Sequence, residues 1–127
     1  MSKVVVDASA VLALVFRESG WETAAPMLHG SLISAVNSAE VTSRYMAKGD
    51  SLAEARAVLE DLHIEIVPFD SVQAYLTGEL HRQTRPYGLS LADCACLALA
   101  RSQGFPAVTA DKAWRSLPLD VEVVLIR

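Results

Sequence analysis

The stretch Val4-Val5-Val6-Asp7-Ala8-Ser9-Ala10 decides the fold of this chain. Its three consecutive valines indicate a short strand that is buried on both faces, as strands of parallel sheets are. Asp7 follows at the carboxyl end of that strand, and Ser9 can cap a helix that begins near Ala10. Because ligands of open α/β sheets bind just outside the carboxyl ends of the strands, Asp7 occupies a position typical of an active-site residue.

The rest of the chain alternates short apolar runs with segments of helical periodicity. The expected strands are 3–6, 31–35, 63–67, 107–109 and 121–126. The expected helices are 10–15, 21–29, 37–48, 52–62, 70–83 and 90–103, with a helical turn at 111–115. This alternation predicts a single α/β domain over residues 1–127, with a mostly parallel sheet and right-handed crossovers.

The composition excludes several classes of protein. The chain has 127 residues, of which 52% are hydrophobic and 20% are charged, so disorder is excluded. No apolar run near the start is long enough to span a bilayer and no signal-peptide pattern is present, so we expect a cytoplasmic protein. The net charge of −4 argues against binding nucleic acid by broad phosphate neutralisation. It allows an enzyme that engages phosphate through a bound cation.

Sulfur and imidazole groups do not form a recognisable metal site. Cys94 and Cys96 are two residues apart, which on a helix turns them to nearly opposite sides, and we expect them to be buried thiols in a reducing compartment. His29, His63 and His81 are scattered without the spacing of a zinc site.

Four acidic residues occupy positions that a parallel sheet can bring to one edge. Asp7 and Asp111 follow predicted strands, and the carboxyl ends of parallel strands meet at the same edge. The segments Asn37-Ser38-Ala39-Glu40 and Ser90-Leu91-Ala92-Asp93 each place an acid three residues after a residue suited to cap a helix. Helix starts lie beside the carboxyl ends of the preceding strands, so all four carboxylates can converge.

Each of these acids also has an alternative role as a helix cap. Asp7 and Asp111 can cap the helices that follow them, while Glu40 and Asp93 can be capping-box partners. Glu40 and Asp93 are nevertheless flanked by small or apolar residues with no adjacent Lys or Arg, and a carboxylate on a buried segment needs a partner. A divalent cation shared among carboxylates supplies one, and oxygen ligands without Cys or His suit Mg²⁺ or Mn²⁺.

Four stretches, in order along the chain, resemble the motifs of PIN-domain ribonucleases, and within that group the VapC-type toxins of prokaryotic toxin–antitoxin systems. They are Val4 to Ala10, Ser38-Ala39-Glu40-Val41, Gly88-Leu89-Ser90-Leu91-Ala92-Asp93-Cys94 and Val108-Thr109-Ala110-Asp111-Lys112-Ala113-Trp114. The resemblance implies a three-layer α/β/α fold with a central, mostly parallel sheet of about five strands. It assigns Asp7, Glu40, Asp93 and Asp111 to an acidic pocket, supported by Ser9 and Thr109, that uses one or two Mg²⁺ or Mn²⁺ ions.

The resemblance further implies endonucleolytic cleavage of RNA, often tRNA or rRNA, a cognate antitoxin that inserts a peptide segment beside the site, and a homodimer. Our hypothesis is that Asp7, Glu40 and Asp93 hold the main ion, while Asp111 completes a second site or orients water. Water activated by the metal would then hydrolyse the phosphodiester and leave a 5′-phosphate and a 3′-hydroxyl.

Seven cationic residues are candidates for contacts with RNA. They are Arg17, Arg44, Lys48, Arg82, Arg85, Lys112 and Arg115. Lys112 and Arg115 are the better candidates because they flank Asp111.

Three other functions remain open at this point. A phospho-acceptor receiver domain has a similar length and a similar alternation of strands and helices. It needs adjacent acids after the first strand, where this chain has Ala8-Ser9 after Asp7. It also needs an acceptor aspartate directly after the middle strand, where this chain has Pro68-Phe69-Asp70. A non-catalytic binding module would keep the acids as caps only. A haloacid-dehalogenase-type phosphatase would require Asp-x-Asp where Asp7-Ala8-Ser9 stands.

Overall fold

The structure is a computed structural model that describes residues 3–127; the expected single domain also included residues 1–2, which lie outside the described part. Strands and helices alternate along the chain, as predicted. In order they are β1 (Val5–Val6), α1 (Ala8–Val15), α2 (Trp21–Leu28), β2 (Leu32–Ser34), α3 (Ala35–Ala47), α4 (Leu52–Asp61), β3 (Glu65–Val67), α5 (Ser71–Thr84), the 3₁₀-helix η1 (Arg85–Tyr87), α6 (Leu91–Gln103), β4 (Ala107–Thr109), the 3₁₀-helix η2 (Lys112–Ser116) and β5 (Val123–Leu125).

The five strands of residues 3–127 form one parallel sheet in the order β3-β2-β1-β4-β5. Val5 of β1 pairs with Leu32 of β2 on one side and with Ala107 of β4 on the other, so β1 lies at the centre of the sheet. The predicted α/β fold with a parallel sheet of about five strands is therefore confirmed. The residue that follows β1, Asp7, lies in the middle of the carboxyl edge.

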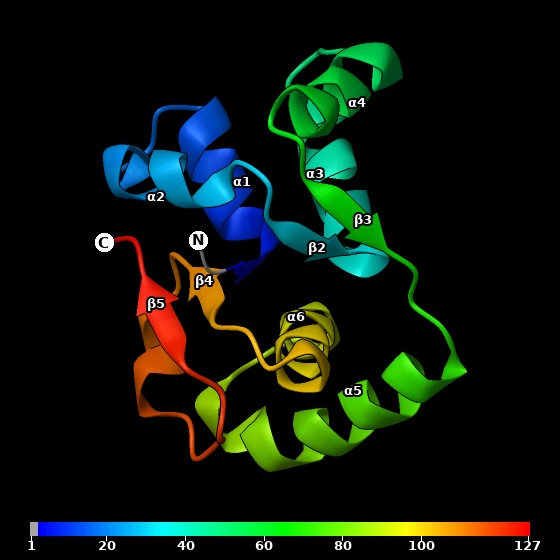
Figure 1. The fold of residues 1–127 in the computed structure, drawn as a ribbon, viewed down its shortest axis with the longest axis vertical. Coiled ribbons are helices and arrows are strands. Elements are labelled where there is room, and N and C mark those ends of the chain that lie inside the picture. Colours follow the sequence, from blue (N-terminus) through cyan, green and yellow to red (C-terminus); the bar gives the residue numbers. More distant parts are fainter. Residues whose placement is uncertain (1–2) are drawn as a thin grey trace.

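Neighbouring residues of β1 pack on opposite faces of the sheet, as the alternation of a strand requires. Val6 belongs to a buried core with Leu28 of α2 and Leu59 of α4. Val5 belongs to a second core with Leu97 of α6. Figure 1 shows α1 and α2 on one side of the sheet and α5 and α6 on the other, which gives the three layers that the resemblance implies.

Helix α1 begins at Ala8, two residues earlier than predicted. Its N-cap is Asp7, whose Oδ1 accepts a hydrogen bond from the backbone N–H of Ala10 at 3.2 Å. The prediction that Ser9 caps this helix is therefore wrong, because Ser9 already lies in the first helical turn and its hydroxyl makes other contacts. A carboxylate with extended backbone, directly before the helix, occupies the capping position first.

Helix α3 also begins two residues early, at Ala35 rather than at Asn37. Ser34, the last residue of β2, is the N-cap and accepts a hydrogen bond from the N–H of Val36 at 3.2 Å. Asn37 consequently lies inside the helix, and Glu40 is its sixth residue rather than a capping-box partner. The capping alternative for Glu40 is removed.

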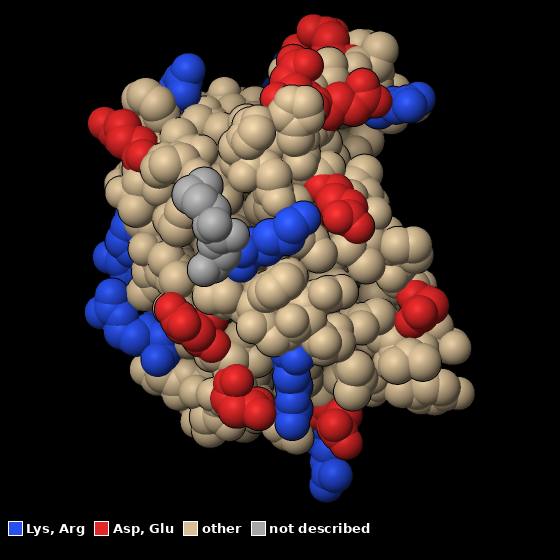
Figure 2. Space-filling view, in the orientation of Figure 1, with Lys and Arg blue, Asp and Glu red and all other residues tan. Residues whose placement is uncertain are grey.

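The surface carries no broad basic area on the face drawn in Figure 2. Acidic side chains gather there over the projecting end of α4, whereas basic side chains are scattered over the face, with one group on the flank formed by β5 and the segment before it. Within residues 3–127, no helix has the length and apolar character needed to cross a membrane.

Candidate active site

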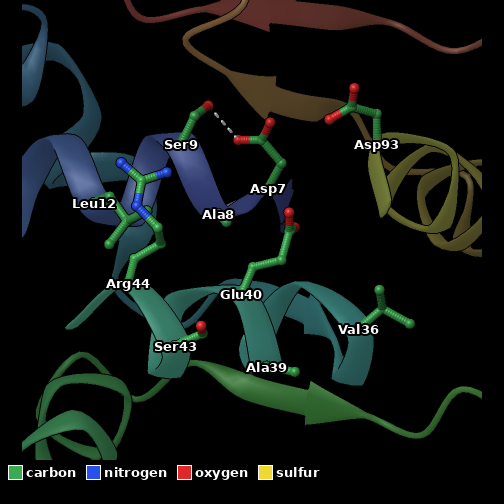
Figure 3. A pocket seen from close by; sticks show the side chains of 10 residues that line it. All are labelled: Asp7, Ala8, Ser9, Leu12, Val36, Ala39, Glu40, Ser43, Arg44 and Asp93. Carbon is green, nitrogen blue, oxygen red and sulfur yellow. Dashed lines mark hydrogen bonds between the residues drawn. The ribbon is translucent and has the colours of Figure 1, made fainter. Parts of the chain in front are cut away.

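A pocket of about 520 Å³ opens at the carboxyl edge of the sheet, between the starts of α1 and α6 and the first half of α3. Its lining includes Asp7, Ser9, Glu40, Arg44 and Asp93. Figure 3 shows the carboxylates of Asp7, Glu40 and Asp93 directed into the same space from three different elements. Three of the four predicted acids are thus brought together.

Asp7 is the most buried acid of the pocket, with 5% of its surface exposed. Ser9 Oγ donates to its Oδ1 at 2.6 Å, and Thr109 Oγ1 donates to its Oδ2 at 2.8 Å. Burial raises the pKa of Asp7 to about 6, although the hydrogen bonds from Ser9, Thr109 and Ala10 oppose that rise. A carboxylate that is desolvated and held from behind on both oxygens is prepared to accept a cation.

Ser9 and Thr109 connect β1 and β4 behind Asp7. Ser9 Oγ accepts a hydrogen bond from the N–H of Ala110 at 2.9 Å, and Thr109 Oγ1 accepts one from the N–H of Asp111 at 3.1 Å. Each hydroxyl therefore accepts a hydrogen bond from a backbone N–H just after β4 and donates a hydrogen bond to Asp7. The two residues that were expected to support the site thus contact the Asp7 carboxylate directly.

Glu40 is oriented by a residue that sequence reasoning treated only as a cap. Asn37 Nδ2 donates to Glu40 Oε1 at 2.9 Å and to the carbonyl oxygen of Ala92, at the start of α6, at 3.0 Å. The spacing of three residues, which puts both side chains on one face of a helix, was the available signal.

Asp93 combines the two roles that the sequence allowed. It is the capping-box partner of Ser90: Ser90 Oγ accepts from the Asp93 N–H at 3.1 Å, and Asp93 Oδ2 accepts from the Ser90 N–H at 2.9 Å. It also lines the pocket. Capping occupies one carboxylate oxygen, and the other remains available to the pocket.

Asp111 does not line the pocket. It is exposed and caps η2, where its Oδ1 accepts a hydrogen bond from the N–H of Ala113 at 2.9 Å. Lys112 and Arg115 lie on η2, are exposed, and are also absent from the pocket lining. The cation that lines the pocket is Arg44, one helical turn after Glu40, and it extends along the pocket from α3 toward α1 (Figure 3).

Comparisons with known proteins were made with the sequence and the fold. The sequence matches the model of the family described as PIN domain over residues 4–119. This chain belongs to the PIN domain family. The matched range contains every residue of the pocket described above. A comparison with curated protein sequences gave no significant match.

Several solved structures similar to this PIN domain are toxin–antitoxin proteins. A toxin–antitoxin complex from Klebsiella pneumoniae has a TM-score of 0.78 and 19% identity over 98% of each chain. DNA-bound VapBC from Salmonella typhimurium has a TM-score of 0.71 and 18% identity over 100% of each chain. VapC20 of Mycobacterium tuberculosis, a sarcin-ricin-loop-cleaving toxin, has a TM-score of 0.74 and 14% identity over 94% of this chain and 99% of that one. At these identities the likeness is one of fold.

The donor set of this PIN domain fits a divalent cation. Asp7, Glu40 and Asp93 offer carboxylate oxygens, and the ion pairs of residues 3–127 lie elsewhere, on α4 and between α6 and the loop before β5. As the side chains lie, the described residues contain no group of three acids, histidines or cysteines that forms a ready-made ligand set. The buried carboxylate of Asp7 accepts hydrogen bonds but has no ion-pair partner among the described residues, and a cation would supply one.

The architecture of this PIN domain argues against the receiver alternative. Receiver-type sheets have the strand order 2-1-3-4-5, in which the third strand neighbours the first. Here β3 is an edge strand, and the aspartate that follows it, Asp70, is an exposed N-cap of α5 that accepts a hydrogen bond from the N–H of Gln73 at 2.9 Å. Asp70 is therefore not placed beside Asp7.

Proposed function

We propose that this chain is a Mg²⁺- or Mn²⁺-dependent endoribonuclease and the toxin of a toxin–antitoxin pair. The observation that carries the proposal is the buried carboxylate of Asp7, braced by two hydroxyls and facing Glu40 and Asp93 across one open pocket. Membership of the PIN domain family supports nuclease chemistry. The fold likeness to VapC20, a sarcin-ricin-loop-cleaving toxin, supports RNA as the substrate.

Asp7, Glu40 and Asp93 would hold the ion. When bound, such an ion activates water and neutralises charge on the phosphate. Ser9 and Thr109 orient Asp7, because each donates to a different oxygen of its carboxylate and together they fix the plane of that group. Asp93 is held by its capping contacts at the start of α6, so Asp7 and Asp93 are both oriented before any ion arrives.

Asp111 caps η2 and does not line the pocket, so its proposed role differs from that of the other three acids. Its backbone N–H holds Thr109, and its side chain caps η2 through Ala113. To complete a second ion site or to orient water, Asp111 would exchange the Ala113 contact for one with the pocket. We therefore propose that its contribution follows substrate or ion binding.

Two groups of cationic side chains would contact RNA, one inside the pocket and one outside it. Arg44 lines the pocket and is the proposed contact for the phosphate that is cleaved. Lys112 and Arg115, on η2 outside the pocket, are proposed contacts for flanking phosphates. The proposed substrate is a structured RNA of the tRNA or rRNA class.

The proposed partners are a cognate antitoxin protein and a second copy of the chain. Toxin–antitoxin assemblies are among the proteins that share this fold, including the complex from Klebsiella pneumoniae. A peptide segment of the antitoxin placed beside the pocket would block access of RNA to Asp7, Glu40 and Asp93.

The proposal is tested by incubating the purified protein with total cellular RNA and Mg²⁺ or Mn²⁺, and by mapping the new 5′ ends. We expect discrete cuts that leave 5′-phosphates and that disappear with Asp7→Asn. Asp70→Asn is the matched control, because Asp70 is also an aspartate N-cap but is exposed and remote from the pocket lining. Cleavage that survives Asp7→Asn undiminished would contradict the proposal.

A further inference from the structure

The buried side-chain amide of Asn37 joins one pocket acid to the element that carries another. Asn37 is 1% exposed. Its Nδ2 donates to Glu40 Oε1 at 2.9 Å and to the carbonyl oxygen of Ala92 at 3.0 Å. Ala92 directly precedes Asp93, so this single group connects α3 to the first turn of α6 beside the pocket.

The chemistry of these two contacts requires an amide. Both partners are acceptors, which fixes the orientation of the Asn37 amide and uses both of its N–H protons. An aspartate at this position has no donor when ionised, and a serine or threonine hydroxyl has only one. Among side chains of this size, asparagine alone can hold Glu40 and the α6 backbone from one nitrogen.

The other end of the same amide is costly to the fold. Asn37 Oδ1 is buried and has no hydrogen-bond partner among residues 3–127. Leaving a buried acceptor unsatisfied destabilises a protein, and a leucine of similar shape would avoid that cost. A locally unfavourable group next to a candidate site indicates that the Nδ2 contacts serve the site rather than the packing.

We propose that Asn37 is a positioning residue, which holds the Glu40 carboxylate toward Asp7 and sets the spacing between α3 and α6. Glu40 has a long side chain with three rotatable bonds, and among the described residues its carboxylate has no hydrogen bond or ion pair apart from the one with Asn37. This inference rests on the proposed metal-dependent function. Partners that orient metal ligands contribute about 10–100-fold to metal affinity, and that is the effect expected here.

The test begins with Mn²⁺ binding to the full chain, measured by titration calorimetry at a temperature where each variant is folded by circular dichroism. Asn37→Leu removes both donors and keeps the shape of the side chain. We expect its Mn²⁺ affinity to fall about 10–100-fold. In RNA cleavage at a fixed, subsaturating Mn²⁺ concentration, kcat should fall while KM for RNA stays constant. Wild-type Mn²⁺ affinity in Asn37→Leu would overturn the inference.

A double-mutant cycle separates positioning from general packing. If Asn37 acts through Glu40, the Asn37→Leu change should weaken Mn²⁺ binding much less in a Glu40→Ala background, where no carboxylate remains to be positioned. Equal losses in the two backgrounds would show that Asn37 acts on the fold as a whole, and would overturn the inference. Asn37→Ser, which keeps one donor on a shorter side chain, replaces Asn37→Leu if the latter does not fold.

Thr77→Val is the matched structural control. Thr77 is 4% exposed and donates to the carbonyl oxygen of Gln73 at 2.7 Å, and it does not line the pocket. Its replacement should lower the melting temperature and leave Mn²⁺ affinity unchanged. If the wild-type protein neither binds Mn²⁺ nor cleaves RNA, the proposed function is contradicted. If the wild type does both and Asn37→Leu behaves like the wild type, only the role of Asn37 is contradicted.

Discussion

Burial of Asp7 makes the stability of the ion-free protein depend on pH. Its pKa is about 6 in the folded chain, against about 4 when unfolded. Between pH 4 and pH 6 the folded state keeps a proton that the unfolded state has lost, so stability falls as pH rises through this window, by about 3 kcal/mol in total. Above pH 6 the loss is complete.

Asp7→Asn should therefore raise the melting temperature of the protein in EDTA at pH 8, because it removes the buried charge. Below pH 4 the two proteins should melt together, since Asp7 is then protonated in both states. Thermal unfolding followed by circular dichroism from pH 3 to pH 8 measures the difference. Asp70→Asn, at an exposed cap, should show no such gain, and a gain of equal size there would contradict the explanation.

At the scale of elements, sequence patterns located the helices but did not choose among competing caps. The box of Ser90 and Asp93 is present as predicted. The similar pattern from Asn37 to Glu40 is not a cap, because Ser34 lies earlier and has the extended backbone that a cap needs. Sequence alone could not show that β2 ends on a residue with a capping hydroxyl.

The start of α2 depends on a glycine that no other residue can replace without strain. Gly20 is the N-cap, with φ of +92°, and a Cβ added there would lie 2.5 Å from the carbonyl oxygen of Ile126. Gly20→Ala should lower the free energy of unfolding by more than the roughly 1–2 kcal/mol that a left-handed backbone costs an alanine. Urea denaturation measures this cost.

Gly30→Ala provides the comparison for that measurement. Gly30 has φ of +75°, but a Cβ added there meets no atom within 4 Å among those described. Gly30→Ala should cost about 1–2 kcal/mol from the backbone alone. Equal losses at the two positions would show that the contact between Gly20 and Ile126 relaxes without cost.

At the scale of the whole molecule, an ion that binds the pocket must stabilise the fold. A ligand of the folded state at 100 times its Kd adds about 2.7 kcal/mol to the free energy of unfolding. We expect Mn²⁺ to raise the melting temperature of the wild type and EDTA to reverse the rise, while Asp7→Asn should not respond. A rise of equal size in Asp7→Asn would place the ion elsewhere.

The convergence of the acids could be predicted from the sequence because it follows from the parallel arrangement. Asp7, Glu40 and Asp93 come from the end of a strand or an early part of a helix, and such positions share one edge of the sheet. The place of Asp111 could not be predicted, because the sequence allowed both a pocket role and a capping role, and the side chain caps η2 through the N–H of Ala113. The strand order, with β1 between β2 and β4, is likewise a property of the assembled sheet.

The hydrogen bond from Thr109 to Asp7 spans 102 positions of the sequence, and this has a consequence during translation. A nascent chain that has not yet emerged beyond β4 has Asp7, β2 and Ser9, but it lacks one of the two strands that pair with β1 and one of the two hydroxyls that orient the Asp7 carboxylate. Incomplete products, released after α6 but before β4 is made, would contain the residues that line the pocket without the Thr109 hydroxyl that holds Asp7 Oδ2. The timing of synthesis therefore restricts the braced form of Asp7 to chains in which β4 has already been made.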